Sequence, residues 1–255
     1  ANGDVEEQIS QIEYFIKKQV DVIVVVAGDC EALSDVMIKA REAGIKTVSY
    51  DRLIMNAGCD LYISFDNTEV GRLMAESMLE NIPDGGDIFL IQGPLTDNNV
   101  SLIREGIDET LAGSNLNVVY EANCPGWIAE NAYTYTKEGL KLDRNVKGII
   151  CGNDDLASQA FRALSEERLA GKVCVTGQDG DLAACQRIVE ETQEMTAFKS
   201  VEQEASLAAK CAVLLGLGEE IEEVQDTAYD GTYNVPYLEL QPIAVTKENM
   251  DEVII

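Results

Sequence analysis

The sequence predicts an α/β fold built from two doubly wound lobes, each with a parallel β-sheet that has helices on both faces. Short β-branched segments alternate with amphipathic helical segments almost from end to end, which is typical of crossovers in parallel sheets. The alternation restarts after Pro83-Asp84-Gly85-Gly86, and 255 residues are enough for two such lobes. We therefore expect a lobe boundary near this break.

The first half of the chain contains three predicted strands. Residues 4–19 carry apolar side chains at helical spacing, and residues 21–26 form the continuous apolar run expected of a buried strand. The other elements predicted before the break are helix 31–43, strands 46–50 and 61–65, and helix 67–81. Since a doubly wound lobe needs about four or five strands, we expect the N-terminal lobe to lack its first β-α-β segment.

The second half repeats the alternation of strand and helix. The predicted strands are 87–92, 117–122, 147–151, 172–176 and 194–198, and the predicted helices are 98–112, 128–141, 154–168, 180–191 and 201–215. The tail is different, because residues 230–236 are loop-like and residues 237–245 return to strand character. A tail strand of this kind can cross back between the lobes.

The charge balance excludes several classes of function. The chain has 46 acidic and 19 basic residues, no histidine and a net charge of −27. A field of this sign repels nucleic acid and anionic lipid, so we expect no nucleic-acid partner. Without histidine there is no Ser-His-Asp triad, no Cys-His pair and no common zinc site. We expect no catalytic residue, no metal and no cofactor.

The cysteines and the hydropathy complete this class assignment. The seven cysteines contain no C-x-x-C pair and are odd in number, so we expect free thiols with packing roles, as for Cys151 and Cys174 within strand-like runs. Such thiols are unusual in exported proteins and suggest a reducing habitat. No apolar run approaches the ~18 residues of a membrane span, and the first residues do not form a signal peptide.

The carboxyl ends of the predicted strands carry a high density of polar side chains. Ligands of open α/β sheets bind at this edge. Carboxylate, amide, guanidinium and ammonium groups can satisfy vicinal hydroxyls, and an indole can stack on the apolar face of a pyranose. The pattern indicates carbohydrate binding. The side chains are Tyr50, Asp51, Arg52, Asp97, Asn98, Asn99, Trp127, Asn153, Asp154, Gln178, Asp179 and Lys199.

Each of these residues also has a purely structural interpretation. Asp154 and Asp181 precede helices and are expected N-caps, and Trp127 could be a core aromatic, although its place after Pro125-Gly126 favours the site. Asp51 and Asp179 could in principle form the acid/base pair of a glycosidase. The chain has no P-loop and no G-x-G-x-x-G motif, and Gly218 is expected to end a helix.

Several motifs together resemble the D-xylose-binding members of the type I periplasmic-binding-protein family, the solute-binding components of ABC sugar importers. The similarity runs the length of the chain. The combination of Tyr-Asp-Arg with Gly-Gln-Asp-x-Asp-Leu-Ala distinguishes the xylose type from its ribose- and galactose-binding relatives. The motifs are Ser49-Tyr50-Asp51-Arg52, Tyr62-Ile63-Ser64-Phe65-Asp66-Asn67, Val70-Gly71, Asp97-Asn98-Asn99, Gly152-Asn153-Asp154, Gly177-Gln178-Asp179-Gly180-Asp181-Leu182-Ala183 and Phe198-Lys199.

The resemblance implies a sugar site and a lobe division. It places sugar contacts on Asp51, Arg52, Asn99, Trp127, Asn153, Asp179 and Lys199, with Asn98 as a second choice. It implies two lobes joined by a three-crossover hinge near 82–86, 199–200 and 229–232, and closure of both lobes on the sugar. The N-terminal lobe would comprise 1–82 and 200–229, and the C-terminal lobe 84–198 and 231–255. The family's first strand, helix and second strand, which contribute further sugar contacts, are not in this chain.

We therefore expect an extracytoplasmic protein, periplasmic or held at the cell surface as a lipoprotein, that binds a pentose. D-xylose is the expected ligand, and the membrane permease of an ABC importer is the expected partner. One alternative is a sugar sensor of the same fold that reports to a membrane receptor such as a histidine kinase. Another is the effector domain of a LacI-type repressor, which the acidic balance fits poorly.

Overall fold

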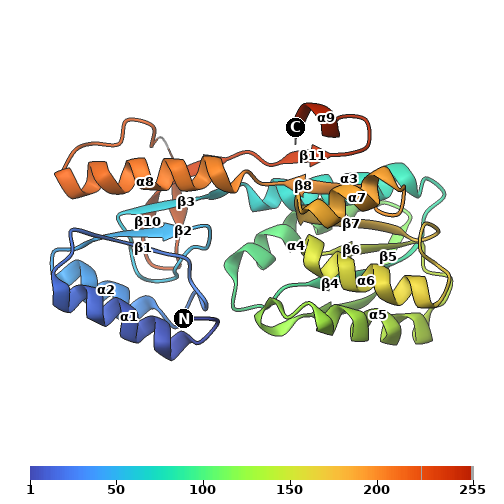
Figure 1. Cartoon of the computed structure of the whole chain (residues 1–255), viewed down its shortest axis with the longest axis horizontal. Helices are drawn as coiled ribbons and strands as arrows, with labels where there is room; N and C mark the ends of the chain where they lie inside the picture. The colour runs from blue at the N-terminus through green and yellow to red at the C-terminus, as the bar shows by residue number, and fades with distance from the viewer. Residues whose placement is uncertain (225, 254–255) are drawn as a thin grey trace. The chain divides into compact units, whose positions relative to one another are not determined.

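The computed structural model describes residues 1–224 and 226–253, which divide into two compact units. Unit 1 comprises Ala1–Asp66, Thr96–Asn99 and Ser200–Leu240, and unit 2 comprises Asn67–Leu95, Val100–Lys199 and the residues from Gln241 onward. Each unit consists of one predominantly parallel sheet with helices on both faces (Figure 1). The predicted α/β fold with two doubly wound sheets is confirmed.

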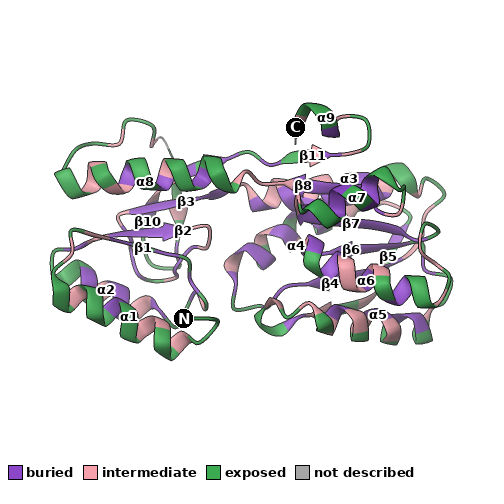
Figure 2. Cartoon of the chain, in the orientation of Figure 1, coloured by how far each residue is buried: buried purple, intermediate pink, exposed green. Residues whose placement is uncertain are grey.

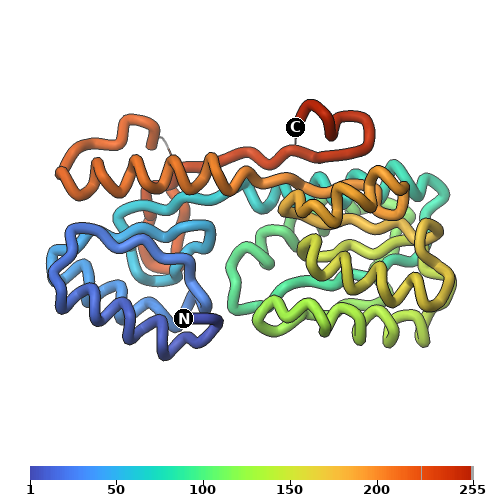
Figure 3. The backbone as a smooth tube through the Cα atoms, viewed as in Figure 1, coloured from blue at the N-terminus to red at the C-terminus, as the bar shows by residue number. Residues whose placement is uncertain are grey.

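The sheet of unit 1 has five strands in the order β1-β2-β3-β10-β9. Neighbouring strands are parallel except for β9, which runs antiparallel to β10. Figure 3 shows the orange-red segment of β10 beside the cyan segment of β3, with which it pairs. The bounds are β1 (Val22–Val25), β2 (Lys46–Tyr50), β3 (Leu61–Phe65), β9 (Asp226–Tyr229) and β10 (Asn234–Leu240).

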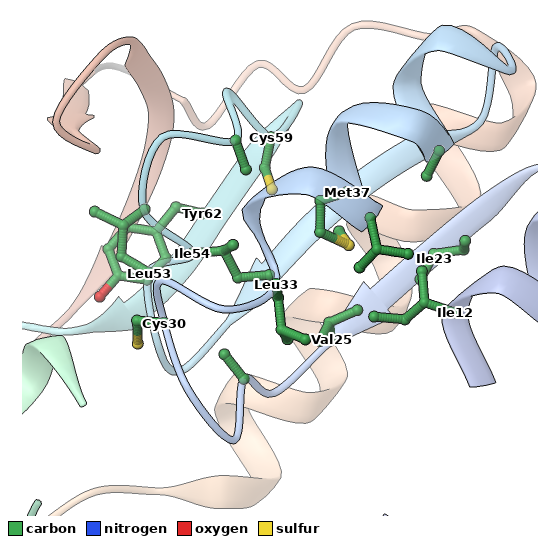
Figure 4. Packing of buried hydrophobic residues seen from close by; sticks show 14 of the residues in the cluster. Ile12, Ile23, Val25, Cys30, Leu33, Met37, Leu53, Ile54, Cys59 and Tyr62 are labelled. Atoms are coloured by element: carbon green, nitrogen blue, oxygen red, sulfur yellow. The ribbon is translucent and has the colours of Figure 1, made fainter. Parts of the chain in front are cut away.

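Three helices cover the two faces of this sheet. Helices α1 (Val5–Lys18) and α2 (Ser34–Glu42) pack on one face, and α8 (Val201–Leu217) packs on the other (Figure 1). The core under α1 and α2 is formed by buried aliphatic side chains such as Leu33 and Met37, shown with their neighbours in Figure 4. Burying such side chains is the main favourable contribution to the stability of the unit.

The sheet of unit 2 has six strands in the order β11-β8-β7-β6-β4-β5. All neighbours are parallel except β11, which runs antiparallel to β8. This order brings the carboxyl ends of β8, β7, β6, β4 and β5 to one edge of the sheet. The bounds are β4 (Gly86–Gln92), β5 (Leu116–Asn123), β6 (Gly148–Cys151), β7 (Cys174–Asp179), β8 (Met195–Phe198) and β11 (Ile243–Val245).

Successive residues of β4 contribute to two different cores, one on each face of the sheet. Ile88 and Leu90 pack towards α3 and α4, whereas Phe89 and Ile91 pack towards α5 and α6. Figure 2 shows these strands buried, with exposed residues on the outer sides of the helices. The helices are α3 (Asn67–Asn81), α4 (Asn98–Leu111), α5 (Glu130–Leu142), α6 (Asp154–Glu166), α7 (Leu182–Val189) and α9 (Met250–Val253), with a 3-10 turn at Pro125–Trp127.

The division into units differs from the predicted lobes at three segments: 67–82, 96–99 and 231–240. Helix α3 packs on β7 and β8 and so belongs to unit 2, because Gly85 and Gly86 form the tight turn that connects α3 to β4 inside that unit. Strand β10 pairs with β3 and therefore belongs to unit 1. The expected loop at 230–236 is partly strand, β9 was not predicted, and the tail contributes one strand to each sheet.

The expectation of free thiols is confirmed. All seven cysteines lie within the described residues, and each is buried and unpaired. Burial raises the pKa of the Cys30 thiol to about 12 and that of Cys124 to about 11. Thiols held neutral in this way act as small hydrophobic side chains.

Candidate functional site

Strand β2 ends at a loop that is tied to β3 and to the segment 96–99. Asp51 adopts a left-handed backbone conformation with φ 63°, which a short polar side chain tolerates better than most. Its backbone N–H donates to Ile63 O at 2.8 Å. Its carbonyl accepts from Ser64 Oγ at 2.7 Å and from Asn99 Nδ2 at 3.1 Å. These bonds hold Asp51 and Asn99 together although they are 48 residues apart in sequence.

Arg52 is held in place by a buried carboxylate. Its Nε lies 2.8 Å from Asp97 Oδ2, and its Nη1 donates to Ala27 O at 3.0 Å. Asp97 is only 2% exposed, and its Oδ1 accepts from the Asn99 backbone N–H at 3.0 Å. Asp97 therefore orients both Arg52 and Asn99. Asp97 is one of the polar side chains that indicate carbohydrate binding, but the resemblance places no sugar contact on it; an aspartate two residues before a site asparagine is the signal for its orienting role.

In unit 2, Asp179 and Lys199 form an ion pair at the ends of two neighbouring parallel strands. Lys199 Nζ lies 3.1 Å from Asp179 Oδ1, and the Lys199 side chain is 14% exposed while that of Asp179 is 37% exposed. The register of β7 and β8 places Asp179 beside Phe198, so the pair follows directly from strand pairing. The lysine is thus largely buried, with its charge balanced by a carboxylate that solvent can reach.

Trp127 and Asn153 follow the ends of β5 and β6. Trp127 has φ 57° and is half-buried against the core under α5 and α6. Its ring lies over Gly93: a Cβ added to Gly93 would come within 2.2 Å of Trp127 Cζ2. The core and site interpretations of Trp127 are therefore compatible. Asn153 is the N-cap of α6, with its Oδ1 accepting from Leu156 N at 2.9 Å.

One of the capping predictions is wrong, and two are confirmed in position. Asp154 is not the N-cap of α6, because Asn153 has the extended backbone that a cap requires and Asp154 is already helical. Asp181 occupies the N-cap position of α7, but its side chain accepts no capping hydrogen bond. Gly218 ends α8 in a left-handed conformation, as predicted.

Asp154 is fully buried behind the segment that carries Asp179. Burial raises the pKa of its carboxyl to about 7, against the lowering effect of hydrogen bonds from Thr196, Gln193 and the Asp181 amide. Its oxygens accept from Thr196 Oγ1 at 2.7 Å and from Gln193 Nε2 at 2.9 Å. The sequence predicted Asp154 as a polar strand-end residue and an N-cap, but not as an acceptor for the turn that follows Asp179.

The seven predicted site residues form two groups, one in each unit. The unit-1 half-site is Asp51, Arg52 and Asn99. Asn99 bonds to the Asp51 carbonyl, and Arg52 and Asn99 both contact Asp97. The unit-2 half-site is Lys199, Asp179, Asn153 and Trp127, which lie at or after the carboxyl ends of β8, β7, β6 and β5; β4 lies between β6 and β5 and contributes none of the four. Both half-sites combine hydrogen-bond acceptors and donors, and in both the cation is already paired with a carboxylate.

The described residues contain no group of three or more metal-ligating side chains that could hold a metal ion. Within the same part of the chain, no helix is both long and apolar enough to cross a membrane.

Two α/β units that each carry polar groups at the carboxyl ends of parallel strands define a solute-binding protein. The chain belongs to the periplasmic binding protein family, whose domain model matches residues 1–220. The family consists of binding proteins, so the expectation that this chain is not an enzyme is confirmed.

Among characterised relatives, the chain is similar to the D-xylose-binding periplasmic protein of Haemophilus influenzae, with 43% identity over 260 residues. It is also 39% identical to the D-xylose-binding periplasmic protein of Escherichia coli K12. Both alignments cover 100% of this chain and 78% of the relative. A multiple sugar-binding periplasmic receptor of Rhizobium radiobacter is 30% identical over 281 residues, which cover 100% of this chain and 78% of the receptor.

Solved structures agree with this assignment. A carbohydrate transporter solute-binding protein from Chloroflexus aurantiacus in complex with D-glucose aligns with a TM-score of 0.90 and 25% identity. An ABC transporter solute-binding protein from Clostridium phytofermentans with bound β-D-glucose aligns with a TM-score of 0.88 and 26% identity. Each alignment covers 99% of this chain and 84% of the other. The predicted type I periplasmic-binding-protein fold is confirmed.

Proposed function

We propose that this chain is an extracytoplasmic sugar-binding protein that takes up D-xylose and delivers it to the permease of an ABC importer. The observation that carries the proposal is the pair of half-sites, in each of which a cation and a carboxylate are paired at the carboxyl ends of parallel strands. We infer that the polar groups of each half-site take part in sugar binding.

The chemistry of the half-sites fits a neutral polyhydroxylated ligand. The carboxylates of Asp51 and Asp179 can each accept from two hydroxyls, while Arg52 and Lys199 can donate to the same or neighbouring oxygens. Because each cation is already neutralised by a carboxylate, neither half-site offers an unbalanced positive charge to a sugar phosphate or a sugar acid. The exposed part of the Trp127 indole can cover the apolar face of the ring.

The choice of D-xylose is supported by the two relatives at 43% and 39% identity, which are both D-xylose-binding proteins. Transport is favoured over sensing, because the similar solved structures are solute-binding proteins of transporters. An extracytoplasmic location is supported by the periplasmic location of the same relatives.

Isothermal titration calorimetry of the full chain with D-xylose, D-ribose, D-glucose and D-galactose tests the proposal. D-xylose should give the largest affinity, and D-glucuronate, which keeps the xylopyranose ring and carries a carboxylate on C5, should bind at least tenfold more weakly. A Glu105→Gln variant, altered on the exposed surface of α4, is the matched control and should titrate like the wild type. Absence of heat with every sugar would overturn the proposal.

A further inference from the structure

The turn that carries Asp179 has an unusual backbone conformation. Asp179 has φ 100° and Gly180 has φ 79°, so two successive residues lie at positive φ. Glycine adopts such values freely, but an aspartate does so at a cost of the order of 1 kcal/mol or more. A conformation of this kind persists only where the surrounding structure fixes it.

The buried side chains of Asp154 and Thr196 hold this turn by accepting hydrogen bonds from its backbone. Asp154 Oδ2 accepts from the backbone N–H of Gly180 at 3.0 Å and from that of Asp181 at 3.0 Å. Thr196 Oγ1 also accepts from the Gly180 N–H, at 3.1 Å, and donates to Asp154 Oδ2 at 2.7 Å. Asp154 and Thr196 are both fully buried, so no water competes for these bonds.

The carboxylate of Asp154 is itself held in one orientation. Gln193 Nε2 donates to Asp154 Oδ1 at 2.9 Å, and Gln193 Oε1 accepts from Arg187 Nε at 2.9 Å. Arg187 is 7% exposed and also donates to Ser158 Oγ at 2.8 Å. The network therefore joins α6, α7 and β8 behind the turn, and its bonds satisfy both carboxylate oxygens.

We propose that Asp154 and Thr196 are positioning residues for sugar binding: they fix the 179–181 turn and so hold the Asp179 carboxylate, paired with Lys199, in the geometry that the sugar requires. The inference rests on the proposed function and adds two residues that act through Asp179 without touching the ligand. A turn released from these acceptors would leave two backbone N–H groups unpaired and would let Asp179 leave the left-handed region.

The decisive variant is Thr196→Val, which removes one hydroxyl and keeps the shape of the side chain. We expect it to weaken D-xylose binding about tenfold by calorimetry, and Thr196→Ser to restore affinity to within about threefold of the wild type. Asp154→Asn serves as a second variant, with an expected loss of D-xylose affinity of about tenfold.

The matched control is Thr136→Val, since Thr136 is also fully buried in unit 2 and its hydroxyl donates to Ala132 O within α5. It should lower stability and leave affinity unchanged.

A double-mutant cycle separates positioning from a general structural effect. In an Asp179→Asn background, where the carboxylate has lost its charge, Thr196→Val should cost less than threefold in affinity. Equal affinity of wild type and Thr196→Val, or the same fold-loss in both backgrounds, would overturn the inference. If the wild type itself binds no sugar, the proposed function fails; if the wild type binds and only the variants behave otherwise, the positioning role alone fails.

Discussion

In both half-sites a buried aspartate orients the site residues, but it does so through different contacts in the two units. In each unit, one buried aspartate accepts backbone N–H groups of the segment that carries a site residue: Asp97 does so for Asn99, and Asp154 does so for the turn after Asp179. In unit 1 the buried aspartate also pairs directly with the site cation, Arg52. In unit 2 the cation, Lys199, pairs instead with the exposed aspartate, Asp179. Loss of Asp97 should therefore remove the ion pair of Arg52 in unit 1, whereas loss of Asp154 should change the backbone of the 179–181 turn in unit 2.

The largest expected effect is in unit 2 and comes from Asp179→Ala. This change removes a proposed sugar acceptor and the carboxylate that pairs with the largely buried Lys199. We expect sugar affinity to fall by at least ~100-fold, measured by calorimetry with D-xylose. An affinity within threefold of the wild type would remove Asp179 from the site and would leave unit 1 as the main determinant of binding.

The corresponding change in unit 1 is Asp97→Asn, which keeps an acceptor for the Asn99 N–H and removes only the charge. Because Asp97 is 2% exposed and its partner Arg52 has 23% of its side chain exposed, we expect an unfolding free energy lower by about 2 kcal/mol and an affinity lower by about tenfold. Urea denaturation and calorimetry measure the two effects. Replacement of the exposed Glu13, which pairs with Lys39 on the surface of unit 1, by Gln is the control and should change stability by less than about 1 kcal/mol.

Trp127 distinguishes the unit-2 half-site from the unit-1 half-site, which has no aromatic member. Trp127→Phe should keep most of the stacking surface and cost about threefold in affinity, whereas Trp127→Leu should cost about tenfold. Since Trp127 is the chain's single tryptophan, its fluorescence should change on titration with D-xylose. A wild-type spectrum that stays constant at saturating sugar would mean that the indole does not face the ligand.

The smallest effect concerns the thiols, which occur in both units. Burial raises the pKa of the Cys124 thiol to about 11 and that of Cys30 to about 12, both above the ordinary value of a thiol. Because the folded-state pKa lies above the unfolded one, the neutral thiols contribute their full stabilisation below about pH 9, and that contribution is lost as the pH rises from 9 towards 12. Iodoacetamide at pH 8 should leave the native cysteines unmodified in mass spectra and modify all seven in urea. Modification of Cys30 alone would identify unit 1 as the more easily opened unit.

Most elements of the fold were predictable because their signals are local. Helical periodicity and short β-branched runs identified the strands and helices of the first 217 residues to within a few positions. The tail was not predictable in the same way. Pro236 lies within β10, and a proline is unusual in a central strand; it is tolerated here because pairing of β10 with β3 begins only at Tyr237. Strand β10 also depends on a partner that lies far away in the sequence.

The residues of the candidate site likewise fall into those that local sequence signals predict and those that depend on long-range contacts. Residues at strand ends, such as Asp51 and Lys199, could be predicted because the edge of a parallel sheet is defined by the strands themselves. Asp154 and Thr196 could not, since their role depends on a contact between residues 42 positions apart and on the backbone angles of a third segment. A sequence shows the group that can bind a ligand more readily than the group that holds it in place.

The position of β10 in the sheet of unit 1 has a consequence for biosynthesis. Strand β10 lies between β3 and β9, so the ribosome completes β3 well before the residues that pair with it emerge. A chain that lacks β10 leaves β3 with an open edge of the kind that chaperones shield and other chains can pair with. Chains truncated before Asn234 should therefore be protease-sensitive in unit 1.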